Sequence, residues 1–206
     1  EDFPEIQKRG IPDLLPDAAK EKWIRFGLFL RGVPTLSRKI LRELKLDRDT
    51  MDKASRFARL FSEEEVESPY ALRKRIARYG LKMVRDFYEM RLALLHQDEE
   101  ELYSPLESDL LESKRRTGEI ITTKKQAESI VKERLLWIMK VESEKNCVSL
   151  SELMLSGKDL ISLGVSPGKR MGEILQLAFD RVLQEPKENE KEKLISYLQE
   201  SGLLDS

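Results

Sequence analysis

The sequence predicts an all-α fold, a bundle or array of about eight to ten helices with a body and a smaller tail. Two observations carry this prediction. Apolar residues recur at intervals of three and four along most of the chain, which is the repeat of one helix face. Typical N-cap residues precede these runs and glycine or proline follows them, whereas alternating strand patterns are almost absent. With 206 residues, 40% of them apolar, the chain is long enough for one or two hydrophobic cores.

Four helices are expected in the first hundred residues. Each is bounded by a capping side chain or by glycine and proline. The first three are Asp17 to Arg31, stopped by Gly32 and Pro34; Thr35 to Leu44, capped by Thr35; and Asp47 to about Glu65, capped by Asp47. Ser68 and Pro69 open a fourth and longer helix, which continues from Leu72 to about Leu95.

This fourth helix carries two stripes. One is apolar and faces a core. The other consists of four cations, Lys74, Arg78, Lys82 and Arg85. Residues 73–91 hold seven basic and two acidic side chains, a local charge of about +5 that favours contact with a polyanion such as RNA. A solvated basic face without a ligand is the alternative.

Further helices are expected after an acidic boundary at 97–101, so we divide the chain into a helical body, 1–100, and a helical tail, 101–206. Capping signals mark each predicted start in the tail. These starts are Ser104-Pro105, Thr123, Ser149 for a short helix to Leu155, Lys158 for a helix to Leu163, Ser166-Pro167, and Asn189 with Glu192. Gly157 and Gly164 would supply turns.

The turn before the Pro167 helix is the most informative stretch. Ser166 is expected as the N-cap and Pro167 as the first helical residue, while Gly168 would let an anion approach the unpaired N–H groups of the first turn. Lys158, Lys169 and Arg170 would add side-chain cations beside these amides. The pattern is similar to a helix-hairpin-helix element that binds nucleic-acid phosphates. A plain connector between packed helices is the alternative.

The same stretch also carries a family resemblance. Eight positions match a pattern of the form Gly-x-Asp-Leu-x-x-x-Gly-x-x-Pro-Gly-x-x-x-Gly-x-x-Leu, namely Gly157, Asp159, Leu160, Gly164, Pro167, Gly168, Gly172 and Leu175. The segments 186–194 and 72–80 match two further patterns. In these features the chain resembles, from about Trp23 to Leu194, the body and tail of class II (bacterial-type) tRNA nucleotidyltransferases, the CCA-adding enzymes and their poly(A) polymerase relatives.

The resemblance implies a tRNA-binding role. The body would follow the acceptor stem and the tail would reach the T-loop elbow, so that an N-terminal catalytic head can add nucleotides to the 3′ end. The family's head carries a Gly-Ser turn and an Asp-x-Asp pair that hold magnesium and CTP or ATP, and neither motif occurs here. With no initiator Met before Glu1, the chain is expected to be an excised C-terminal portion without catalytic residues, cofactor or activity of its own. Which nucleotides the parent enzyme adds depends on the head.

Two other functions are compatible with the sequence. A helical protein-interaction module would have no RNA affinity, and a helix-hairpin-helix DNA binder would hold duplex DNA as well as tRNA. The net charge of −1 means that any nucleic-acid affinity depends on local clusters of charge. The single histidine, His96, excludes a histidine metal cluster, and the His-Asp pair of many relatives' body is missing. Cys147 is the only cysteine and no membrane span is evident, so a reducing cytoplasm is expected. The oligomeric state stays open.

Overall fold

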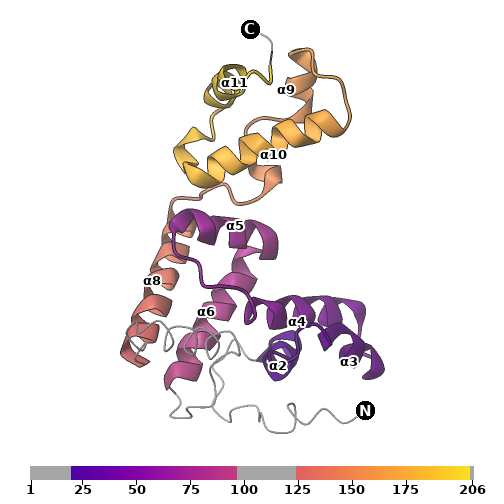
Figure 1. The fold of residues 1–206 in the computed structure, drawn as a ribbon, viewed down its shortest axis with the longest axis vertical. Coiled ribbons are helices and arrows are strands. Elements are labelled where there is room, and N and C mark those ends of the chain that lie inside the picture. Colours follow the sequence, from indigo (N-terminus) through magenta and orange to yellow (C-terminus); the bar gives the residue numbers. More distant parts are fainter. Residues whose placement is uncertain (1–19, 97–123, 205–206) are drawn as a thin grey trace, which may run out of the picture. The chain divides into compact units, whose positions relative to one another are not determined.

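The computed structural model describes residues 20–96 and 124–204, and over these ranges the predicted all-α fold is confirmed (Figure 1). Nine α-helices and two short 3-10 helices make up the described part of the chain, which contains no β-strand. The acidic boundary at 97–101 and the helix expected from Ser104-Pro105 lie outside the described residues. No helix among those described is long and apolar enough to cross a membrane.

The described residues form two compact units. Unit 1 comprises 20–65, 81–96 and 124–136, and unit 2 comprises 66–80 and 137–204. Each unit thus collects segments that are distant in sequence, and the units do not follow a single division at residue 100. The division into an RNA-binding body and tail concerns function and stays a prediction.

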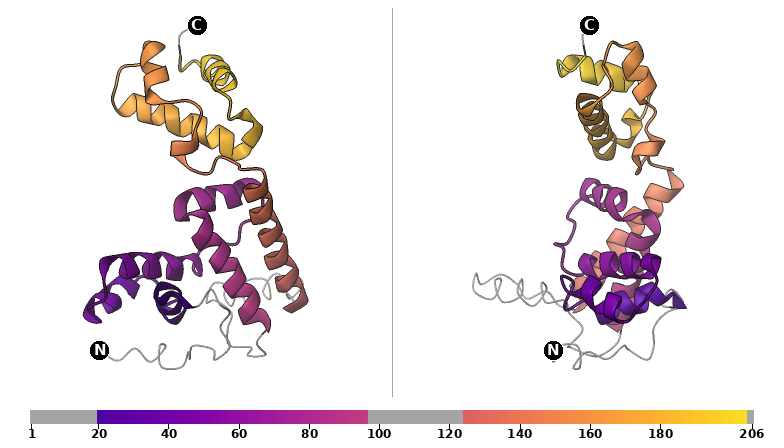
Figure 2. Two further views of the ribbon diagram at one scale, coloured as in Figure 1. Left: turned by 180° about the vertical axis from the view of Figure 1, so that it is seen from behind. Right: turned by 90° about the vertical axis from the view of Figure 1, so that its right-hand side faces the viewer.

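Unit 1 is built around aromatic contacts between α2 (Lys22–Phe29) and α4 (Arg48–Leu60). In Figures 1 and 2, α2 is seen nearly end-on where α4 lies across the view, so the two helices cross at a large angle. The crossing is close because Gly27 lacks a side chain: a Cβ there would lie 2.7 Å from a ring carbon of Phe57. Phe57 is fully buried, and its ring centroid lies 5.3 Å from that of Trp23. Trp23 is therefore a core residue.

Two capping residues predicted for the N-terminal helices, Asp47 and Thr35, have different outcomes. Asp47 caps α4 as predicted, accepting a hydrogen bond of 2.8 Å from Thr50 N. The prediction for Thr35 was wrong. The next helix, α3 (Ser37–Glu43), begins two residues later, and Ser37 Oγ donates to the carbonyl of Pro34 instead. The first predicted helix also ends early, at Phe29, because consecutive tight turns follow it.

The long helix predicted from Leu72 to Leu95 is two helices. Ser68 caps the first, α5 (Pro69–Tyr79), as expected, and Gly80 separates it from α6 (Leu81–His96). Gly80 has φ 91° and ψ 145°, a conformation that side chains with a Cβ rarely adopt. The four predicted cations therefore do not form one stripe: Lys74 and Arg78 belong to unit 2, Lys82 and Arg85 to unit 1.

The break at Gly80 can be tested by substitution. Gly80→Ala is expected to lower the free energy of unfolding by about 1–3 kcal/mol, because alanine must hold a strained φ although space for its Cβ is open. Urea unfolding of the variant and the wild type measures the difference. A variant as stable as the wild type would contradict the broken-helix description, since a continuous helix favours alanine over glycine.

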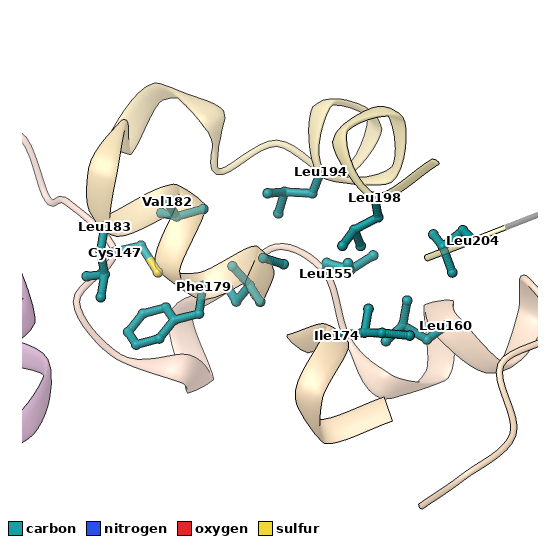
Figure 3. Packing of buried hydrophobic residues seen from close by; sticks show 12 residues of the cluster. Cys147, Leu155, Leu160, Ile174, Phe179, Val182, Leu183, Leu194, Leu198 and Leu204 are labelled. Carbon is teal, nitrogen blue, oxygen red and sulfur yellow. The ribbon is translucent and has the colours of Figure 1, made fainter. Parts of the chain in front are cut away.

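Unit 2 contains α5, the end of α8 (Lys124–Ser143) and the remaining helices around one apolar core. These helices are η3 (Leu150–Glu152), α9 (Gly157–Ser162), α10 (Lys169–Gln184), η4 (Pro186–Glu188) and α11 (Lys191–Glu200). Figure 3 shows side chains of α10 and α11 pointing toward one another and toward Leu155 and Leu160. Cys147 lies in this core, where burial raises the pKa of its thiol and keeps it protonated.

Two capping predictions for unit 2 have different outcomes. Ser149 and Glu152 form the expected capping box, although they cap a single 3-10 turn. Asn189 does not cap α11, which starts at Lys191 after Glu190. Its side chain accepts a hydrogen bond from Met154 N and donates one to the carbonyl of Glu152. Asn189 thereby links the start of α11 to the segment after η3.

Candidate nucleic-acid interface

The predicted RNA site includes the connection between α9 and α10. It forms a loop at the outer edge of unit 2 (Figure 1). Gly164, with φ 85°, ends α9 by donating its N–H to Ile161 O, and Val165 N donates to Leu160 O at 2.9 Å. These two hydrogen bonds define a Schellman motif. Leu160 is buried and Val165 packs on the same core, so the start of the loop is anchored to the core of unit 2.

The helix after this loop starts two residues later than predicted. Its N-cap is Gly168, not Ser166, and its first residue is Lys169. Gly168 has φ 145° and ψ −161°, which is accessible essentially to glycine alone, and this conformation moves the start past Pro167. The first intrahelical N–H belongs to Gly172, which donates to Gly168 O. The N–H groups before it have no carbonyl one turn earlier to bind.

The predicted residues of this loop are all at the surface. Lys158, Ser166, Gly168, Lys169 and Arg170 are exposed. Lys169 Nζ lies 3.5 Å from a carboxylate oxygen of Glu173, and both side chains are mostly in solvent. Within the described residues, Lys158 and Arg170 have no ion-pair partner. The loop therefore presents two cations to which no carboxylate is bound.

Gly157 holds the two helices of the loop together. A Cβ at this position would lie 3.1 Å from Met171 Sδ, so the start of α9 packs directly against the first turn of α10. Lys158 follows Gly157 and Arg170 precedes Met171 in the chain. The close approach thus places the cations of the two helices in one region. Gly157 was expected in a turn and is instead the first residue of α9.

Asp159 has a structural role within the same motif. It forms a capping box with Ser156 at the start of α9 and an ion pair with Lys191 of α11. The hydrogen bonds from Lys191 and Ser156 lower the pKa of Asp159 well below its usual value. Lys191 lies in the 186–194 segment and Asp159 in the 157–175 segment, so this ion pair joins the two segments that carry the resemblance. The two patterns are parts of one fold.

The pKa of Asp159 predicts an acid-dependent contribution to stability. A carboxylate whose pKa is lower in the folded chain stabilises it above the unfolded pKa, about 3.9, and the contribution is lost as pH falls toward the folded value. The melting temperatures of wild type and Asp159→Asn are therefore expected to differ more at pH 7 than at pH 2. Other carboxylates titrate in both proteins, so their effect cancels. A difference that grows on acidification would contradict the assignment.

The two predicted cations on α5 lie beside α10. Lys74 Nζ is 3.2 Å from Asp180 Oδ1, and Tyr70 donates a hydrogen bond to the same carboxylate. These two partners raise the pKa of Lys74, whose ammonium stays charged. Arg73 was one of the seven basic residues of the 73–91 stretch and was not predicted as a site residue. Its guanidinium donates to the carbonyls of Leu183 and Gln184 at the end of α10. Arg73 therefore caps α10 and fixes α5 against it.

A groove of about 650 Å³ lies between α5 and α10. Its lining includes Lys74 and Arg78 from α5 and Glu173, Gln176, Leu177 and Phe179 from α10. Because Glu173 is the partner of Lys169, the groove adjoins the predicted loop site. Lys74, Arg78 and the loop cations thus all belong to unit 2. The sequence did not indicate Gln176 and Leu177 as site residues, because their position beside α5 depends on tertiary packing.

Lys82 and Arg85 belong to the other unit. They lie on α6 in unit 1, where Lys82 Nζ donates to Glu21 at 2.7 Å and to Asp86 at 2.8 Å. Arg91, another cation of the same stretch, pairs with Glu65. These ion pairs reduce the local charge of about +5 counted in the sequence. Contact of Lys82 and Arg85 with RNA stays a prediction.

The described residues contain no group of three or more histidine, cysteine or carboxylate side chains that could hold a metal ion. The candidate site is therefore composed of cations, exposed amides and an adjoining groove. Such an arrangement can bind phosphates.

Comparison with known protein families finds a match in the C-terminal part of the chain. Residues 108–198 match the family model of tRNA nucleotidyltransferase domain 2. The match includes the 157–175 motif and the α9–α10 loop, whereas 72–80 lies before it. No curated protein and no solved structure gave a significant match. The resemblance seen in the sequence is confirmed for this part of the chain: residues 108–198 are similar to tRNA nucleotidyltransferase domain 2.

Proposed function

We propose that this chain is the tRNA-binding C-terminal portion of a tRNA nucleotidyltransferase. The family match over residues 108–198 carries the proposal, because it includes the loop with Lys158, Lys169 and Arg170. The exposure of these three cations supports a surface role for them. In the parent enzyme a separate head would hold magnesium with CTP or ATP and add nucleotides to the 3′ end of the bound tRNA. The chain alone would be inactive.

The mode of binding follows from the types of residues. Lysine and arginine that contact phosphates position an RNA without reading its bases, as an enzyme that serves every tRNA requires. A-form RNA is recognised mostly through its shape and backbone. The tail loop would contact the elbow near the T-loop, and the body would contact the acceptor stem. The proposed place of action is the cytoplasm, where the single Cys147 would stay reduced.

Binding preference is the experiment that tests this function. The affinity of the 206-residue chain is measured for a whole tRNA, an acceptor/T-arm minihelix and a duplex DNA of equal length, each at several salt concentrations. We expect salt-sensitive binding to tRNA and minihelix and weaker binding to DNA. Equal affinity for DNA would instead indicate a helix-hairpin-helix DNA binder. Absence of binding to all three at low salt would contradict the proposal and favour a protein-interaction module.

A further inference from the structure

The groove between α5 and α10 has the size and lining of a ligand site. Its volume of about 650 Å³ lies within the range of small-molecule and cofactor sites, roughly 300–1,000 Å³. Phe179, 6% exposed, and Leu177, 38% exposed, give it an apolar surface, and Lys74 and Arg78 stand on the opposite helix. We propose that this groove accepts an unpaired nucleotide of the RNA bound at the α9–α10 loop. The inference rests on the proposed function and adds a second subsite to it.

The charges of the groove are compatible with a nucleotide. Two carboxylates line it, and each already has a cationic partner: Asp180 binds Lys74, and Glu173 lies near Lys169. Neither carboxylate therefore adds an uncompensated negative charge that would repel a phosphate. Arg78 adds a further positive charge to the α5 side.

Helix α10 links the loop to the groove. Lys169, Glu173, Gln176 and Asp180 follow one another at intervals of three or four residues, so they share one face of this helix. The Gln176 side chain is exposed and has no hydrogen-bond partner within the described ranges, which leaves its amide able to donate to and accept from a base edge. An RNA strand held at Lys169 can therefore continue along this face and place a base against Leu177 and Phe179.

A protein partner fits the groove less well. Nine of the described residues line it, whereas a stable protein interface uses about 20–30 residues on each side. A single base needs only an apolar surface, which Leu177 supplies, and a few polar groups such as the Gln176 amide. The size of the groove thus favours one nucleotide over a helix, a peptide or a second copy of the chain.

The test uses Leu177→Glu, which places a negative charge in the groove at a partly exposed position. Met154→Glu is the matched control, because Met154 is exposed in unit 2 and does not line the groove. The probes are a fluorescein-labelled uridine hexamer and a blunt 12-base-pair RNA duplex. We expect Leu177→Glu to weaken hexamer binding about tenfold and duplex binding less than about twofold. Met154→Glu should leave both affinities near those of the wild type.

Three binding results would overturn the inference. They are unchanged hexamer binding by Leu177→Glu, an equal loss for hexamer and duplex, and a wild-type chain that binds tRNA but not the hexamer. If the wild-type chain binds tRNA but not the hexamer, the proposed function still holds. If it binds neither tRNA nor the hexamer, the proposed function itself is wrong. Thermal unfolding checks that Leu177→Glu is folded, and Gln176→Ala provides a second groove variant, expected to weaken hexamer binding a few-fold. A monomer–dimer shift in Leu177→Glu would show that a second copy occupies the groove.

Discussion

Replacing Lys158, Lys169 and Arg170 together by alanine is expected to weaken tRNA binding more than about tenfold at low salt. Each phosphate contact releases condensed cations, so the plot of log affinity against log salt should become shallower by about 2–3 for three lost contacts. Thermal stability should change little, because all three side chains are exposed and the Lys169–Glu173 pair is a surface pair. Fluorescence anisotropy over a salt series measures both quantities.

A control variant with the same change in net charge tests whether the loss of tRNA affinity is specific to the α9–α10 loop. Lys140, Lys145 and Lys187 are also exposed lysines of unit 2, outside the α9–α10 loop. Their joint replacement by alanine lowers the net charge by the same three units, and it should reduce tRNA affinity much less than the loop variant. Equal losses in both variants would show that affinity follows net charge alone. Unchanged tRNA binding in the loop variant would remove the loop from the site.

Local capping chemistry was predictable from the sequence. Asp47, Ser68 and the Ser149–Glu152 pair act as predicted, because each side chain binds a backbone group within three residues. Ser166 was predicted wrongly although its neighbours fit the usual pattern. The reason is the backbone of Gly168, whose conformation places the helix start two residues later. Gly168 was predicted only to allow close approach of an anion, because its role as N-cap depends on the backbone conformation of the folded chain.

Contacts between distant segments were not predictable in the same way. Asn189 has the residue type and spacing of a cap, yet its amide binds backbone groups 35 and 37 residues away. The ion pair of Asp159 with Lys191 likewise connects residues that only the folded chain brings together. Two sequence patterns pointed to the family through these residues. Their physical role, which joins α9 and α11, depends on the tertiary structure.

The charge stripe shows how one backbone angle changes a functional prediction. Helical periodicity puts Lys74, Arg78, Lys82 and Arg85 on one face only while the helix is continuous. A single glycine at residue 80 ends it, and the cations then belong to separate units. Two of them consequently line a groove with α10 that no pattern in residues 72–95 could indicate. The candidate site is thus partly predictable, at the loop, and partly a result of packing, at the groove.

Phe57→Ala is expected to lower the free energy of unfolding by about 3–5 kcal/mol, the usual cost of truncating a fully buried aromatic residue. Phe57 is 0% exposed, and three rings surround it in edge-to-face geometry: its centroid lies 5.3 Å from that of Trp23, 5.6 Å from that of Phe61 and 6.4 Å from that of Phe87. Its removal leaves a cavity and takes away these aromatic contacts. Urea unfolding followed by tryptophan fluorescence measures the loss.

An exposed residue of the same unit gives the comparison for this variant. Leu44 is 55% exposed, so Leu44→Ala should change the free energy of unfolding by less than about 0.5 kcal/mol. The close crossing at Gly27 limits relaxation around residue 57, because α2 and α4 already touch there and can move little closer. The cavity should therefore persist and the cost should fall in the upper part of the range. If Phe57→Ala proved as mild as Leu44→Ala, Phe57 would not be the centre of the unit 1 core.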